Sequence, residues 1–213
     1  TVQVPLRQRL HLRGLVASVG SILRQPQIRW ALLASAASGM IKEGMNLWGP
    51  TFLVQAKGLD ITTAALSGTV IPLAGAAGAA LGGILTTRFG EGRTTSIGAG
   101  AVVLGAVLLY ALPAGLPVGF TFALLGLMAL GAHGVNAMLV TSIPLSLSSQ
   151  GSASAAAGTF DFISYVGGGL SAIIVGTLQS MLGWPAVFAF WALAALCVGL
   201  LGIRGTKGEL YAV

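Results

Sequence analysis

Long apolar runs follow one another along almost the whole chain, separated by short polar or glycine- and proline-marked connections. A run of about twenty apolar residues is long enough to cross the hydrocarbon core of a bilayer as one helix. We identify such runs at about residues 28–55, 62–87, 97–112, 118–143, 155–182 and 186–203. The pattern therefore predicts an all-α membrane protein with six transmembrane helices.

Composition agrees with an apolar environment for most of the chain. Hydrophobic residues make up 55% of the 213 residues and charged residues only 8%, whereas soluble domains carry roughly 25% charged residues. The net charge of +6 is compatible in principle with nucleic-acid binding. The basic residues, however, lie in the connections on one side of the spans, so we exclude nucleic acid as a partner.

The basic residues also predict the orientation of the chain. With six spans, three basic segments fall on one side of the membrane, and only Lys57 falls on the other. Those segments contain Arg7, Arg9, Arg13, Arg24, Arg29, Arg88, Arg93, Arg204 and Lys207. Because positive residues stay on the cytoplasmic side, both termini are predicted to be cytoplasmic. We expect a plasma or inner membrane rather than an organelle membrane.

Three parts follow from this organisation. Residues 1–27 form a basic amphipathic cytoplasmic connector, residues 28–203 a six-helix domain, and residues 204–213 a cytoplasmic tail. The connector keeps its apolar residues at helical spacing. A transit-peptide remnant is the alternative, whereas a signal peptide is disfavoured because no small-x-small cleavage site follows. The chain begins with Thr1 rather than methionine, so we expect a fragment or a processed product.

Glycines predict where the helices pack. The second span carries Gly75, Gly78, Gly82 and Gly83, and the fifth carries the triplet at 167–169. Small residues let two helix backbones approach closely, which is how membrane helices gain van der Waals contact. Each set is therefore expected to form one helix–helix contact face.

The first span carries two charges near its middle, Lys42 and Glu43. Charged side chains at that depth are costly, so they indicate a functional site that faces the bundle interior or an aqueous cavity. Lys42 and Asn46 are i and i+4 and share a helix face, whereas Glu43 is rotated by about 100° and is expected to make a different contact. Lys42 is a binding residue in one interpretation and a structural partner of Glu43 or Asp161 in the other.

Two more spans carry polar pairs at helical spacing. His133 and Asn136 are i and i+3 on the fourth span, and Asp161 and Tyr165 are i and i+4 on the fifth. Three helices that each present one polar pair predict a central cavity. The alternative is structural, with these side chains satisfying one another through hydrogen bonds between helices.

Motifs for catalysis are absent from the sequence. There is no HExxH, no GxSxG, no pair of cysteines and no GxGxxG after a strand. Two histidines and few acids do not build a metal site. We therefore predict that the protein is not an enzyme and holds neither a metal nor another cofactor.

One connection resembles a family motif. Residues 83–93, GILTTRFGEGR, are similar to the G-x-L-x-D-R-x-G-R loop of the major facilitator superfamily, with Thr87 in place of the usual Asp. Together with six spans, a basic lead-in and both ends inside, this motif resembles the carboxy-terminal half of such a transporter. The resemblance implies that Arg88, Gly90 and Arg93 form its gating loop.

Two further segments resemble a subfamily, the organophosphate:phosphate antiporters. Residues 25–30 and 42–53 fit its N-P-x-x-W and R-Y-G-x-x-D-W-x-P-T-Y-L patterns, and residues 156–168 fit A-A-G-F-x-x-x-x-x-Y-L-G-G. The resemblance places Lys42 where the family has a phosphate-binding arginine and Tyr165 at a cavity tyrosine, with His133 near another. Glu43 stands where the family has an aromatic residue.

The resemblance implies the following function. The chain is expected to be a six-helix half of two three-helix inverted repeats that exchanges a phosphorylated metabolite, a small organic anion, for phosphate across the bilayer by alternating access. Lys42, Asn46, His133, Asn136 and Tyr165 are expected to bind the solute, and Glu43 and Asp161 to couple charge or protons. An amino-terminal six-helix half is expected on the same chain or on a partner chain. A receptor-like relative that senses the solute, and a half-transporter that acts as a dimer, are the alternatives.

Overall fold

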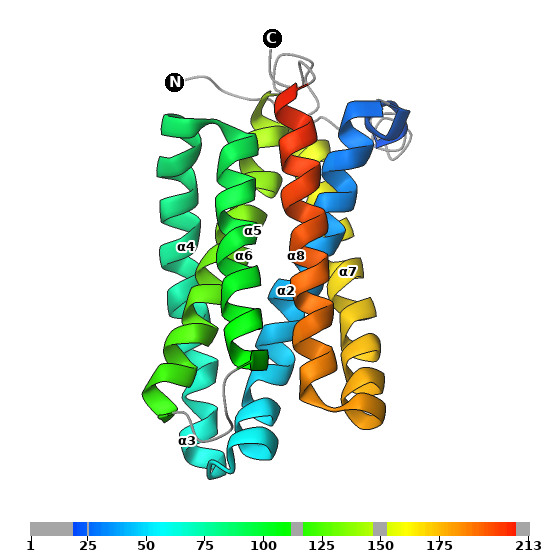
Figure 1. The fold of residues 1–213 in the computed structure, drawn as a ribbon. Coiled ribbons are helices and arrows are strands. Elements are labelled where there is room, and N and C mark those ends of the chain that lie inside the picture. The colour runs from blue at the N-terminus through cyan, green and yellow to red at the C-terminus, as the bar shows by residue number, and fades with distance from the viewer. Residues whose placement is uncertain (1–18, 25, 112–116, 147–152, 208–213) are drawn as a thin grey trace, which may run out of the picture.

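The computed structural model describes residues 19–24, 26–111, 117–146 and 153–207, and the regular structure in these residues is helical (Figure 1). A short helical segment occupies residues 19–24. The remaining helices are α2 (Pro26–Lys57), α3 (Ile61–Ala65), α4 (Ser67–Phe89), α5 (Glu91–Ala111), α6 (Val118–Ser146), α7 (Ala153–Leu182) and α8 (Trp184–Lys207). The prediction of an all-α fold is confirmed.

Five helical segments in the described residues are long and apolar enough to cross a membrane. They are Ile61–Phe89, Glu91–Ala111, Val118–Leu145, Ala153–Leu182 and Trp184–Gly202. The sixth predicted span corresponds to α2, which is 32 residues long and runs beside the others in the same bundle (Figure 1). It is less apolar than they are because its middle carries Lys42 and Glu43. Length and composition therefore identify five candidate spans, and α2 is not among them.

Helix boundaries differ from the prediction in two connections. The loop expected at 88–93 is a single residue, Gly90, which lies between α4 and α5 with φ +81°. Pro144, expected to bend or end the fourth span, lies inside α6, which continues to Ser146. Apolar patterns mark only the lipid-buried part of a helix, whereas backbone hydrogen bonding continues through polar turns beyond it. A proline close to a helix end removes only one of these bonds.

The helices pair in a symmetric pattern. The chain divides into two triplets of helices, α2, α3–α4 and α5 in the first and α6, α7 and α8 in the second. Each contact of the first triplet with the second has a counterpart when the triplets are exchanged: α2 packs on α7 as α6 packs on α4, and α2 packs on α8 as α6 packs on α5. The contact between α5 and α8 is its own counterpart. Between α2 and α6, the first helices of the two triplets, Ser38 Oγ donates to the carbonyl of Ala132 at 3.4 Å. An odd number of helices per triplet reverses the direction of the second triplet, so this pairing is the one expected of two inverted three-helix repeats.

Glycines allow the closest of these contacts. A Cβ on Gly39 or Gly167 would overlap the facing backbone across the α2–α7 contact, and one on Gly78 or Gly82 would meet α6. Gly75 is buried against α6 as well. The predicted faces are therefore confirmed with one correction: Gly83 and Gly169 are exposed, with open space where a Cβ would lie. They are adjacent in sequence to contact glycines, but a helix turns about 100° per residue.

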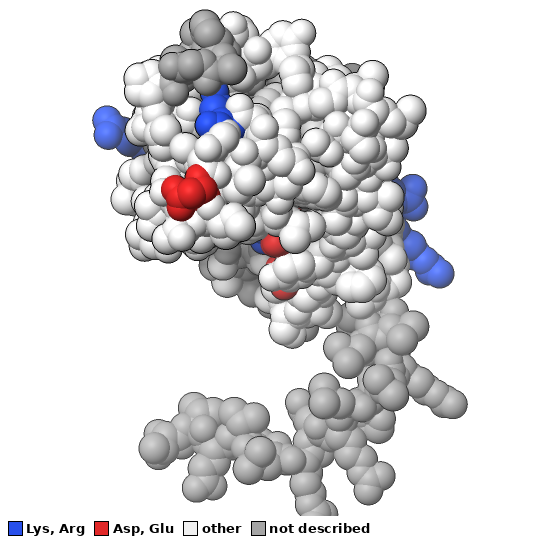
Figure 2. All heavy atoms as spheres, turned by 90° about the horizontal axis from the view of Figure 1, so that it is seen from below, with Lys and Arg blue, Asp and Glu red and all other residues white. Residues whose placement is uncertain are grey.

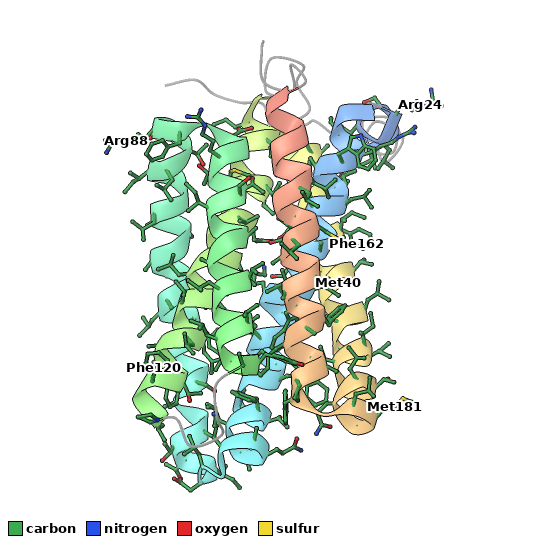
Figure 3. All side chains as sticks on the ribbon, viewed as in Figure 1. Arg24, Met40, Arg88, Phe120, Phe162 and Met181 are labelled. Carbon is green, nitrogen blue, oxygen red and sulfur yellow. The ribbon has the colours of Figure 1, made fainter. Side chains whose placement is uncertain are left out.

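Charged side chains are sparse and lie mainly at the ends of the bundle. Arg24 and Arg88 lie at the same end (Figure 3), and the α4–α5 connection places Arg93 there too. Lys57, the last residue of α2, and Asp60, in the connection to α3, lie at the opposite end (Figure 1). The end-on view of Figure 2 shows few charged side chains on the end of the bundle that is lowest in Figure 1.

Candidate functional site

Lys42 lies at the middle of α2, between an acid and an aromatic ring. Its Nζ is 3.0 Å from Glu43 Oε1, and the two side chains are 10% and 28% exposed. The same ammonium lies 5.1 Å from the centre of the Tyr165 ring on α7, within the range of a cation–π interaction. Burial of the methylenes with the charge paired is how a lysine is tolerated at this depth.

The ion pair corrects one prediction about Glu43. Neighbouring residues project about 100° apart on a helix, which predicted separate contacts, but the long lysine side chain reaches around the helix to its neighbour. Gly168 on α7 makes the arrangement possible, because a Cβ there would lie 2.6 Å from Cβ and Cγ of Glu43. The predicted alternative partner of Lys42, Asp161, makes no salt bridge with it in the part of the chain that the structure describes.

His133 approaches this pair from α6. The charges of Lys42 and Glu43 act electrostatically on its ring. The ring packs against Gly75 on α4, where a Cβ would come within 2.7 Å of it. Its Nε2 is buried and has no hydrogen-bond partner among the described residues. The histidine thus brings one ring nitrogen to a polar region between three helices.

Asn136 is engaged in the contact between α6 and α7. Ser164 Oγ donates to Asn136 Oδ1 at 2.8 Å, and Ser164 is fully buried. Although Asn136 and His133 share one side of α6, they therefore contact different neighbours, α7 and α4. The carbonyl oxygen of Asn136 is occupied by this serine, which leaves its NH₂ group as the donor available to a ligand.

Asn46 follows Lys42 by one turn of α2. Its Oδ1 is buried and lacks a hydrogen-bond partner among the described residues. Buried polar atoms are usually paired, so this oxygen is a position where a hydroxyl-bearing ligand or water can donate. The predicted Lys42–Asn46 face is consistent with this position.

Asp161 lies one turn before Tyr165 on α7. It is partly buried, and it forms neither a salt bridge nor a hydrogen bond among the described residues. Its neighbour Phe162 points outward from α7 (Figure 3), and Tyr165 is 57% exposed. This side of α7 is open, whereas Ser164 on the other side is buried against α6.

The predicted gating loop keeps the turn that its glycine requires. Gly90 adopts φ +81°, a left-handed region in which side chains with a Cβ are disfavoured. Its N–H donates to the carbonyl of Thr86 at 2.9 Å, and its own carbonyl accepts from Thr94 Oγ1 at 2.9 Å. Arg88 and Arg93 are both exposed on either side of it.

Sequence reasoning missed three residues of this region. Ser164 was not singled out, although a serine three residues before the glycine triplet lies on the same helix face as the contact glycines. Ser171 and Trp191 were missed as well: both are buried with unpaired polar atoms next to Gly44. Composition alone does not distinguish such residues from ordinary membrane-helix serines and tryptophans.

Taken together, α2, α6 and α7 gather a cation, an acid and several hydrogen-bonding groups at mid-helix. Charge is nearly balanced there, because Glu43 neutralises Lys42. An anion reaching Nζ therefore competes with a carboxylate at 3.0 Å. Such an arrangement can bind an anion reversibly, and it contains no nucleophile–base pair of the kind catalysis needs.

Comparison with known proteins identifies the family. The profile of the Major Facilitator Superfamily matches residues 3–172. The chain belongs to this superfamily. It is therefore an integral, multi-pass membrane protein of a transporter family rather than an enzyme.

A curated relative narrows the comparison. The chain is 28% identical over 174 residues to a protein of Arabidopsis thaliana named "Putative glycerol-3-phosphate transporter 4". The alignment covers 76% of this chain and 32% of the relative, so the chain spans about a third of the length of the relative it matches. The resemblance to organophosphate transporters noted from the motifs agrees with this match.

Proposed function

We propose that this chain is the six-helix half of a transporter that moves a small organic anion, a phosphorylated metabolite exchanged for phosphate, by alternating access. α2 is the sixth span in this proposal. The observation that carries it is Lys42, an ammonium at mid-helix whose only paired acid is its own neighbour Glu43 among the described residues. The named function of the Arabidopsis relative supports glycerol 3-phosphate as the first solute to test.

Competition between the solute and Glu43 is the centre of the proposed mechanism. A phosphate oxygen replaces Glu43 Oε1 on Lys42 Nζ, and the freed carboxylate either turns to the aqueous side or takes up a proton. A lysine offers a compact charge rather than the two-pronged fork of an arginine, so the remaining phosphate oxygens need other donors. The His133 ring, the Asn136 amide and the Tyr165 hydroxyl are the candidates, while Asn46 Oδ1 accepts from a solute hydroxyl.

Charge coupling is assigned to the two acids. Displacement of Glu43 leaves a carboxylate that repels a bound dianion, so protonation of Glu43 favours binding. Asp161, which is partly buried without a partner among the described residues, is the second candidate for proton uptake. Both positions lie in helices assigned to the membrane, where an unpaired carboxylate is costly.

A second six-helix half completes the proposed transporter, because α2 and α7 present an open side with exposed aromatic and aliphatic residues. It lies on the same chain or on a partner chain. Arg88, Gly90 and Arg93 form the proposed gating loop on the cytoplasmic side, with both termini on that side and the protein in a plasma or inner membrane. The basic residues at that end of the bundle support this orientation.

Exchange in vesicles tests the proposal. The protein is reconstituted together with its second six-helix half in vesicles loaded with phosphate, and uptake of labelled glycerol 3-phosphate is measured for wild type, Lys42→Ala and Lys42→Arg. Hydrogen bonds to charged groups are worth about 1.5–3 kcal/mol. We therefore expect Lys42→Ala to raise the half-saturating concentration of glycerol 3-phosphate by about tenfold or more, and Lys42→Arg to retain exchange. Lys57→Ala, at the far end of α2, is the matched control and is expected to behave as wild type.

Three outcomes contradict parts of the proposal. Unchanged exchange in Lys42→Ala removes this lysine from the binding site. Binding of glycerol 3-phosphate without exchange favours a receptor-like protein that senses the solute. Exchange that requires two copies of this chain and no other half favours a half-transporter that acts as a dimer.

A further inference from the structure

The α5–α8 contact leaves a groove on the face of the bundle away from the polar site. Its cavity volume is about 430 Å³, with Ser96, Gly100 and Leu104 on α5 and Leu196 and Leu200 on α8 among the residues that line it. Apart from the Ser96 hydroxyl, which donates to backbone carbonyls of its own helix and of Gly199, these side chains are apolar or absent. In Figure 1, α5 and α8 lie in front of α6 and α2.

We propose that this groove binds one acyl chain of an anionic phospholipid whose head group is held by Arg93. The surroundings of the groove favour a lipid over a soluble ligand. Both α5 and α8 are among the helices long and apolar enough to cross a membrane, so the groove opens toward hydrocarbon rather than water. Leu104, Leu196 and Leu200 at its edges are 53%, 48% and 60% exposed.

Length supports a single acyl chain from one leaflet. From Ser96 to Val107 the helical rise is about 16 Å, which is close to half of the roughly 30 Å hydrocarbon core of a bilayer. A second cavity of about 300 Å³, lined by residues that include Val107, Tyr110 and Phe188, continues the same interface toward the other end. The first cavity therefore lies within one leaflet, at the basic end of the bundle.

Charge complementarity supports an anionic head group. Arg93 is exposed, and it precedes Ser96 by three residues and Gly100 by seven, so it lies above the groove on the same stripe of α5. It takes part in no salt bridge among the described residues. The nearest acid in sequence, Glu91, lies about 200° around the helix from Arg93, away from this stripe. Cytoplasmic leaflets are rich in anionic lipid.

Position 100 offers a direct test, because a larger side chain in place of Gly100 would occupy the groove. A Cβ at this position would meet nothing within 4 Å, so Gly100→Leu directs a side chain into the groove from a position where its Cβ has room. Gly83 on α4 is a matched control: it is likewise exposed and has open space around the position of a Cβ. Both replacements raise helix propensity by a similar amount.

Native mass spectrometry of the purified protein with phosphatidylglycerol or phosphatidylcholine measures how many lipid molecules stay bound. We expect wild type and Gly83→Leu to retain one phosphatidylglycerol in preference to phosphatidylcholine, and Gly100→Leu to lose both. Removal of one arginine near an anionic head group weakens binding by about fivefold. Arg93→Gln is thus expected to lose the preference for phosphatidylglycerol, whereas Arg93→Lys keeps it.

Other occupants give different results. If Gly100→Leu leaves bound lipid unchanged, or if wild type shows no preference between the two lipids, the proposal is overturned. If Gly100→Leu instead converts a dimer to a monomer with the same lipid count, the groove binds a second copy of the chain. Because the readout is bound lipid and not transport, failure here leaves the proposed solute site untouched, and the reverse also holds.

Discussion

Replacing Lys42 and Glu43 singly and together isolates the energy of their interaction. At 3.0 Å and an effective dielectric constant of about 20, the Coulomb attraction is about 5.5 kcal/mol. Desolvation and side-chain ordering oppose it: exposed pairs contribute below about 1 kcal/mol, whereas breaking a buried pair costs about 3–5 kcal/mol. With side chains 10% and 28% exposed, the pair lies between these cases, and we expect a coupling of about 2 kcal/mol.

The assay is a double-mutant cycle of Lys42→Met, Glu43→Gln and the double variant, with free energies of unfolding measured in detergent. We expect Lys42→Met to destabilise the protein most, because it leaves Glu43 unpaired beside Gly168. Glu43→Gln is expected to cost less, since the ammonium keeps the Tyr165 ring at 5.1 Å. Additive effects, with a coupling below about 0.5 kcal/mol, would refute the expectation that the Lys42–Glu43 ion pair stabilises the folded protein.

Anion competition extends the same cycle. If phosphate displaces Glu43 from Lys42 Nζ, saturating phosphate lowers the Lys42–Glu43 coupling, because the lysine then has another partner. Glu43→Gln is also expected to bind phosphate more tightly than wild type does, since no carboxylate competes. A coupling that phosphate leaves unchanged would indicate a permanent structural pair and would exclude Lys42 from the proposed solute site.

Three further predictions concern packing, a hydrogen bond and pH. Gly39→Ala is expected to destabilise the α2–α7 contact by about 1–3 kcal/mol, as overpacking does, while Gly169→Ala, with open space around it, leaves the unfolding free energy unchanged or raises it slightly. Ser164→Ala removes the donor to Asn136 and is expected to cost about 0.5–1.5 kcal/mol in the same unfolding assay; no loss of stability would show that another donor replaces it. The hydroxyl and backbone N–H of Thr63 lower the pKa of Asp60 below its ordinary 3.8, so the Asp60 cap on α3 is present above pH 3.8 and is lost as the pH falls through the lowered pKa. Protection of the amides at the start of α3, which is the exchange rate corrected for its intrinsic pH dependence, is expected to fall there in wild type and to stay unchanged over the same pH range in Asp60→Ala.

Prediction from the sequence worked best where one short-range rule decides the outcome. The apolar runs predicted every long helix, because a helix in lipid must satisfy all its backbone groups internally. Gly78 and Gly167 were predicted as contact residues because close backbone approach in membranes needs small side chains. Which glycines in a cluster make contact depends on helix rotation, and for that reason Gly83 and Gly169 were assigned wrongly.

The polar residues show the limit of that reasoning. Spacing put Lys42 on one face of α2 and Glu43 on another, but the reach of a lysine side chain and the room left by Gly168 brought the two together. The sequence did not predict Ser164 as a partner of Asn136, because their hydrogen bond depends on how α6 and α7 pack against each other. Contacts between helices more than twenty residues apart depend on rotation and tilt, which periodicity does not encode.

The sequence by itself determined that this protein is a helical membrane protein with a charged residue pair at mid-helix, since hydrophobicity and backbone hydrogen bonding act locally along the chain. Only the tertiary structure decided which acid neutralises Lys42, which ring lies beneath it, and that α5 and α8 leave a groove below Arg93. These features depend on the distances between side chains of different helices, and such distances exist only once the helices have packed.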